Sequence, residues 1–214
     1  MSDALIEKIS QNLIECQPEE TVESTREALE NELNPLDIIN QGLMPGMDVI
    51  GEKFQTGEYF LPQMVIAARA MQEALKVLEP ELKNRQESVE SRGTLVIGTV
   101  EGDIHEIGKS LVASLMSANV FTVHDVGIDV SPELFIEKVK ETKATLLGLS
   151  ALLTTTMTAQ RKVIKALEEA GIRDQVKVMV GGAPVTEEWA DSIGADGYAD
   201  DVMGAILLSK QLVS

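Results

Sequence analysis

The chain has 214 residues and a formal net charge of −17, which arises from 18 basic and 35 acidic side chains. Such a charge repels a polyanion, and no basic patch with interleaved aromatic residues offsets it, so we expect no nucleic-acid partner. No apolar run is long enough to span a membrane, and the start of the chain lacks the features of a signal peptide. Because Cys16 is the single cysteine, no intrachain disulfide can form, and a reducing cytoplasm is the expected location.

Residues 1–88 are predicted to form helices. Apolar side chains recur at helical spacing near the start of the chain, and Pro18 followed by two glutamates is typical of a helix start. Asn34 before Pro35 predicts a helix cap and a break in the helical pattern. The stretch 44–83 then predicts two further helices, which the sequence QTGEY separates. Four short helices joined by small loops favour a four-helix bundle.

The pattern changes in the second half of the chain. A polar segment places the linker at residues 89–93 and a second domain at residues 94–214. This domain contains short aliphatic or β-branched runs, namely TLVIGTV, VFTVHDV, TLLGLSA, VKVMVGG and the weaker GADGYAD, and helical stretches separate them. The alternation predicts right-handed crossovers and a flavodoxin-like (Rossmann-like) α/β domain with a five-stranded parallel sheet.

Polar and glycine-rich residues gather where these predicted strands end. In open parallel sheets, ligands bind beyond the carboxyl ends of the strands, near the point where the strand order reverses. An order of 2-1-3-4-5 would place that point between the first and third strands. The residues concerned are Asp103, His105 and Gly108 after the first strand, Ser150, Thr154, Thr155 and Thr156 after the third, and Gly181 and Gly182 after the fourth. The sequence therefore predicts a ligand site at this edge of the sheet.

The residue types in this cluster suit a bound cofactor. In an Asp-X-His pair, the Asp103 carboxylate can hold one imidazole nitrogen of His105 while the other nitrogen faces outward, as in metal-ligating histidines. Hydroxyl groups can donate and accept hydrogen bonds along a narrow slot, and glycines let a planar or phosphate-bearing ligand approach the backbone. Asp103 and His105 are therefore candidate site residues.

Each feature also has an ordinary structural interpretation. An Asp-X-His pair is commonly an exposed polar pair, a glycine pair is commonly a tight turn, and the Ser/Thr cluster could cap the helix that begins near Met157. His124 lies inside the second strand and is predicted to be a strand residue. The motifs of dinucleotide-binding, phosphate-binding and zinc sites are absent from the sequence. The agreement of three loops on one edge favours a binding site.

Three segments, in this order and at these spacings, resemble the signature of cobalamin-binding domains. They are DIHEIG at 103–108, SAL at 150–152 and GG at 181–182, which match Asp-X-His-X-X-Gly, Ser-X-Leu and Gly-Gly. Residues 43–71 look like the helical cap that accompanies this domain in methionine synthase and in small corrinoid proteins. The resemblance covers nearly the whole chain.

The resemblance implies a corrinoid bound base-off and histidine-on. His105 becomes the lower axial ligand of cobalt, oriented by Asp103, and the detached dimethylbenzimidazole tail runs down a slot beside the sheet. Thr156 stands where methionine synthase has a serine, so it keeps the hydroxyl group and adds a methyl group. The implied cofactor-binding residues are Asp103, Ile104, Gly108, Ser150, Leu152, Thr154, Thr156, Gly181 and Gly182, together with Phe54, Leu61 and Met64 on the methyl side of the cap.

The resemblance further implies a methyl carrier rather than a stand-alone catalyst. Cycling between Co(I) and methyl-Co(III), it would shuttle a methyl group from a substrate-specific methyltransferase to a second one that uses tetrahydrofolate or a thiol. A reductive activase would restore oxidised cobalt. Methanol, methylamines, betaines and aryl methyl ethers all remain open as donors. The alternatives are a cobalamin-binding subunit of an adenosylcobalamin-dependent mutase and a cofactor-free flavodoxin-like binding module.

Overall fold

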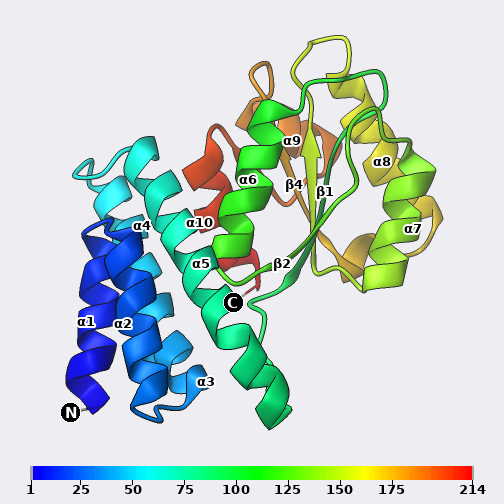
Figure 1. The fold of residues 1–214 in the computed structure, drawn as a ribbon. Coiled ribbons are helices and arrows are strands. Elements are labelled where there is room, and N and C mark those ends of the chain that lie inside the picture. The colour runs from blue at the N-terminus through cyan, green and yellow to red at the C-terminus, as the bar shows by residue number, and fades with distance from the viewer. Residues whose placement is uncertain (1, 214) are drawn as a thin grey trace. The chain divides into compact units, whose positions relative to one another are not determined.

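The computed structural model describes residues 2–213 and divides into two compact units (Figure 1). The first comprises the residues up to Glu90, and the second comprises most of the chain from Ser91 onward. The first unit contains α1 (Ser2–Ile14), α2 (Pro18–Glu30), α3 (Pro35–Asp37), the π-helical η1 (Ile38–Leu43), α4 (Met44–Gln55) and α5 (Leu61–Arg85). Among residues 2–213, no helix has the length and apolarity needed to cross a membrane.

The helical pattern breaks between α2 and α3, as predicted at Asn34 and Pro35, and the segments α3, η1 and α4 then follow one another without a break. Asn34 does cap the start, because its side-chain oxygen accepts a hydrogen bond of 2.8 Å from the N–H of Leu36. Pro45 lacks an N–H, and its ring would clash with the carbonyl group four residues earlier in a regular helix. The wider π turn, in which Met44 donates its N–H to the Ile39 carbonyl, accommodates this proline.

The helices of the first unit form the predicted four-helix bundle. The buried face of α2 is small and partly polar, and its hydroxyls bond to the preceding turn: Thr21 to Gln17 (2.7 Å) and Thr25 to Thr21 (2.8 Å). These bonds satisfy the buried hydroxyl groups, and the small side chains let α2 pack closely on α5. The other helices supply the larger core side chains, which include Ile9, Leu13, Ile39, Leu43, Met47, Ile50, Met64, Met71 and Leu78.

The second unit contains the predicted five-stranded parallel sheet. Its strands are β1 (Thr94–Thr99), β2 (Thr122–Asp125), β3 (Leu146–Ser150), β4 (Lys177–Gly181) and β5 (Gly197–Ala199), in the order β2-β1-β3-β4-β5. The helices are α6 (Ile107–Ala118), α7 (Pro132–Thr142), α8 (Met157–Glu169), α9 (Glu187–Ile193) and α10 (Val202–Val213), with a short 3₁₀ turn, η2 (Arg173–Gln175). The strand order confirms the reversal point between β1 and β3.

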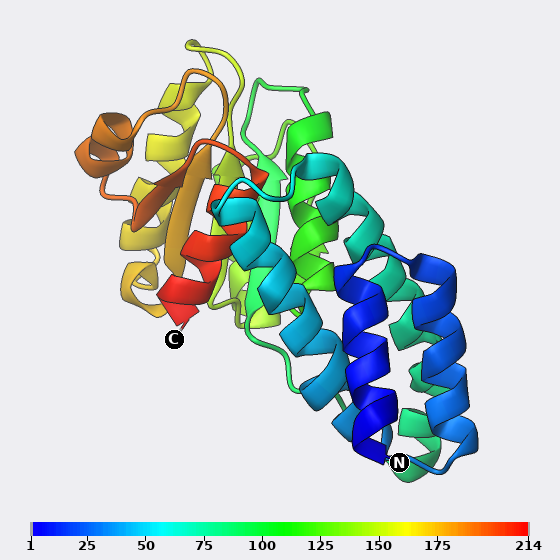
Figure 2. The ribbon, with the colours of Figure 1, turned by 90° about the vertical axis from the view of Figure 1, so that its left-hand side faces the viewer.

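Helices cover both faces of this sheet (Figure 2). α7, α8 and α9 pack over a core that contains Phe135, Val163 and Ile193, while α6 and α10 lie on the opposite face. Because both faces are covered, the central strands are buried along almost their whole length rather than at alternate residues. His124 lies in β2 opposite Val96 of β1, as predicted for a strand residue.

Candidate functional site

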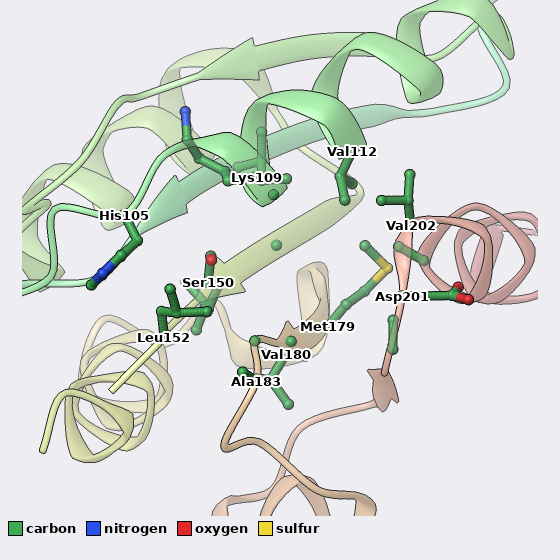
Figure 3. Close-up of a pocket in the computed structure, with 18 of the residues that line it drawn as sticks. His105, Lys109, Val112, Ser150, Leu152, Met179, Val180, Ala183, Asp201 and Val202 are labelled. Atoms are coloured by element: carbon green, nitrogen blue, oxygen red, sulfur yellow. The ribbon is translucent and has the colours of Figure 1, made fainter. Parts of the chain in front are cut away.

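A cavity of about 620 Å³ opens within the second unit at the carboxyl ends of β1, β3 and β4 (Figure 3). One wall comes from the sheet and the other from α6 and α10. Of the residues that the sequence indicated, those that line it are Ile104, His105, Gly108, Ser150, Leu152, Gly181 and Gly182. Thr154 is exposed and does not line the cavity, and Asp103 and Thr156 are buried and are not among the lining residues.

Asp103 is the buried centre of the hydrogen bonding at this site. Its Oδ1 accepts from the N–H of His105 (3.1 Å) and lies 2.7 Å from His105 Nδ1, while its Oδ2 accepts from the Leu152 N–H (2.8 Å) and the Thr156 hydroxyl (2.6 Å). Burial alone would raise the pKa of this carboxyl group, but the hydrogen bonds, led by those from Thr156 and His105, bring the pKa well below its usual range. Asp103 is therefore ionised at neutral pH.

His105 has one ring nitrogen fixed and the other available. An ionised Asp103 accepts a hydrogen bond from Nδ1, so the proton resides there and the lone pair of Nε2 is directed elsewhere. The side chain is 45% exposed, and the Thr99 hydroxyl donates to the His105 carbonyl at 2.8 Å, which anchors the backbone. This arrangement matches that of histidines that bind metals through Nε2.

Thr156 keeps the hydrogen bond that a serine would make. Its single hydroxyl proton has two acceptors within reach, and the shorter, charge-assisted contact with Asp103 is the stronger one. The additional methyl group of Thr156 faces Gly102, which has φ +82°. A Cβ atom at Gly102 would lie 3.7 Å from that methyl carbon, an ordinary van der Waals distance. The methyl group is therefore accommodated without displacing the hydroxyl group.

The predicted glycines serve two different purposes. Gly182 has φ +127°, and a Cβ atom there would lie 1.9 Å from the Ala151 carbonyl oxygen, so only glycine permits this contact between strand ends. At Gly181 a Cβ atom would lie 2.9 Å from the Ala199 carbonyl oxygen. Gly108, by contrast, lines the cavity, and a Cβ atom there would have no neighbour within 4 Å. The glycine pair thus keeps the strand ends together, while Gly108 leaves space for a ligand.

The loop after β2 supports the site, although the sequence showed nothing distinctive there. The Asp129 carboxylate accepts a hydrogen bond from the Gly102 N–H (2.7 Å), and the Asp129 N–H donates to the Asp103 carbonyl (2.9 Å). At the end of β2, Asp125 pairs with Lys109 at 2.5 Å, and the Lys109 side chain is fully buried. The available sequence signal was a lysine in a helix that has no other charged residue, whereas Asp129 offered none.

The remaining predicted residues belong to the first unit. Phe54 is half-buried, Leu61 is 40% exposed and Met64 is buried in the bundle core. Phe60, which the sequence analysis did not single out, is 62% exposed. Leu61 and Phe60 therefore present apolar surface, whereas the Met64 side chain contributes to packing within the bundle.

Two family models match this chain. One B12 binding domain model matches residues 93–207, and a second B12 binding domain model matches residues 5–79. The chain belongs to the B12-binding family. The predicted family and cobalamin cofactor are thereby confirmed, and the cofactor-free alternative is not supported.

Similar proteins extend this result over nearly the whole of the B12-binding chain. The trimethylamine corrinoid protein of Methanosarcina barkeri is 46% identical over 208 residues, which are 97% of this chain and 96% of the relative. Dimethylamine corrinoid protein 3 of Methanosarcina acetivorans is 45% identical over 211 residues, 99% and 98% of the two chains. A chain of the methanol:cobalamin methyltransferase complex MtaBC from Methanosarcina barkeri matches with a TM-score of 0.85 and 32% identity, covering 99% of this chain and 80% of that one.

The residues of the cavity fit a corrinoid. Cobalt accepts a neutral imidazole nitrogen as a ligand, and His105 presents one that a buried carboxylate orients. The open wall at Gly108 and the mainly apolar lining suit a flat, apolar ring such as the lower base of this cofactor. The donor chemistry and the shape of this B12-binding site therefore agree with the family.

Proposed function

We propose that this corrinoid protein carries methyl groups between two methyltransferases and receives them from a methylated amine. The relatives named as trimethylamine and dimethylamine corrinoid proteins, at 45–46% identity over nearly the whole chain, support the donor class. The likeness to a methyltransferase complex supports a methyltransferase partner. When bound, the corrinoid supplies a cobalt that takes a methyl group from one substrate and yields it to another.

In this function His105 would hold the cobalt of the corrinoid through Nε2. The free Nε2 is the observation that carries the proposal, because Asp103 occupies the other nitrogen and Thr156 fixes Asp103. An ionised carboxylate behind the ring makes the imidazole a stronger electron donor than it would be alone. This corresponds to base-off, histidine-on binding.

The cavity would hold the detached nucleotide tail. Ser150 and Leu152 lie at the end of the cavity near His105 (Figure 3). Gly181 and Gly182 also line the cavity. An apolar ring held in such a cavity would be shielded from water and would gain packing contacts. Thr154 is exposed outside the cavity and has no part in this proposal.

The first unit would act as a cap that protects the methyl group, with Phe54 and Leu61 on its contact surface. Phe54→Ala should bind cobalamin with nearly unchanged affinity, while the methylated protein should lose its methyl group several-fold faster under illumination. Photolysis followed by absorbance provides the measurement. An unchanged photolysis rate, together with a much lower melting temperature of the bundle, would instead assign Phe54 a purely structural role.

The partners follow from the carrier role. A substrate-specific methyltransferase loads the protein, a second methyltransferase passes the methyl group to tetrahydrofolate or a thiol, and a reductive activase restores the cobalt after accidental oxidation. These proteins would meet the chain in the cytoplasm.

The donor is tested by supplying the reduced, cobalamin-loaded protein with methyltransferases specific for trimethylamine, dimethylamine or methanol, each with its own substrate. We expect an amine-specific enzyme to methylate the protein at least tenfold faster than the methanol enzyme, as followed by absorbance. Faster methylation by the methanol enzyme would contradict the amine donor, and no methylation by any of the three would contradict the carrier role in these systems.

A further inference from the structure

The part of the cavity away from His105 is lined by apolar side chains. Val112 of α6, Met179 of β4 and Val202 of α10 face one another there (Figure 3). The polar side chains of the lining are engaged or lie outside this region. The Lys109 ammonium group pairs with Asp125, the Asp201 carboxylate accepts the N–H of Gly204 at 2.7 Å, and Glu106 and Asp200 are exposed at the rim.

The sheet forms a flat strip in this region. Ile97, Gly148 and Met179 are register partners on β1, β3 and β4, so they form one row across the sheet. Gly148 has no side chain between its two larger neighbours, and a Cβ atom there would lie 3.1 Å from Ile97 Cγ1. The main-chain N–H and C=O groups of this row are used in the hydrogen bonding between the parallel strands. The strip therefore offers contact area to a planar ring but offers it no free hydrogen-bonding groups.

Met179 is held in place at the edge of this strip. It is 4% exposed, and the fully buried Ser209 hydroxyl lies 3.1 Å from its sulfur atom. Met179 therefore presents a fixed apolar surface to whatever ring lies on Gly148.

We propose that Gly148 and Met179 make this protein select corrinoids with a benzimidazole lower base over those with a purine lower base. The inference rests on the proposed function, in which the nucleotide tail occupies this cavity. A benzimidazole presents carbon edges to the apolar strip. Adenine also presents ring nitrogens and an amino group, which would lose water without gaining a partner. Such unpaired groups should lower the affinity at least tenfold.

The test measures dissociation constants of the apo protein for cobalamin, for the corresponding cobamide with an adenine lower base, and for cobinamide, which lacks the tail. Met179→Gln places an amide beside the ring, and Met179→Leu is the matched apolar control. The free energy needed to dissociate each lower base from cobalt is a property of the corrinoid and is the same for every protein variant. This term therefore cancels when the preference for cobalamin, which is the ratio of the two dissociation constants for the adenine cobamide and for cobalamin, is compared between variants. We expect this preference to fall at least tenfold in Met179→Gln and to stay within about threefold in Met179→Leu.

A second variant covers the case in which Met179→Gln does not fold. Val112→Thr is nearly isosteric and adds a hydroxyl group to the opposite wall, so it should lower the same preference about threefold or more. An unchanged preference in the folded variants would overturn the selectivity proposal while leaving the proposed function intact. Cobinamide bound as tightly as cobalamin by the wild-type protein would instead show that the tail does not occupy the cavity, which contradicts the proposed binding mode itself.

Discussion

Replacing His105 with alanine should leave cobalamin bound but remove the axial nitrogen from its cobalt. The cavity that would hold the tail is otherwise unchanged, so we expect binding to weaken by about 100-fold rather than disappear. In the Co(II) state, the electron paramagnetic resonance spectrum of the wild-type protein should show splitting from one axial nitrogen, and the variant should lack it. The absorbance spectrum should shift towards a water-ligated, base-off form.

His124 provides the matched control, because it is the other histidine of the chain and lies in β2 away from the cavity lining. His124→Ala should keep both the affinity and the nitrogen splitting. Persistence of the splitting in His105→Ala would mean that another group ligates the cobalt, and the assignment of His105 would then be wrong.

Asp103→Asn should destabilise the apo protein by about 3 kcal/mol, as measured by urea unfolding. The carboxylate accepts hydrogen bonds from four donors, and an asparagine presents an NH₂ group to two of them. Hydrogen bonds to a charged group contribute about 1.5–3 kcal/mol each, and buried donors left without an acceptor add their own cost. In the loaded protein, the loss of this partner should also weaken cobalamin binding about tenfold.

The pH dependence of this effect has a definite sign. Hydrogen bonding lowers the pKa of Asp103 in the folded protein, so its stabilisation is fully present above the unfolded pKa of about 4 and is lost as the pH falls towards the folded pKa. The difference in unfolding free energy between wild type and Asp103→Asn should therefore shrink below about pH 4. A difference that grew on acidification would contradict this account.

Two substitutions of Thr156 measure the contribution of its hydroxyl group to stability separately from that of the Asp103 carboxylate, again by urea unfolding. Thr156→Ser keeps the donor to Asp103 and should remain within about 1 kcal/mol of wild type, whereas Thr156→Val removes it and should cost about 2 kcal/mol. A Thr156→Ser variant that is less stable than Thr156→Val would show that the methyl group contributes more than the hydroxyl group at this position.

Several features of the site could be predicted from local patterns alone. Strand–helix alternation predicts a parallel sheet, and the carboxyl ends of parallel strands meet at one edge, so Asp103, Ser150 and Gly181 had to lie near one another. The two-residue spacing within Asp103–His105 allows the carboxylate to reach Nδ1 through the local chain, as the 2.7 Å contact confirms. Such information is contained in short segments and in the order of the elements.

Other features depend on contacts between segments that no local pattern relates. Asp129 supports the His105 loop because the ends of β1 and β2 are adjacent, and Lys109 is buried because Asp125 lies opposite it. Gly182 must be glycine because of the Ala151 carbonyl oxygen, which lies 31 residues earlier in the chain. Local patterns and the order of the elements were enough to predict the fold and the family, and they predict His105 as the metal ligand. Only the tertiary structure decided which residues hold that histidine in place, because such support comes from side chains that folding brings together.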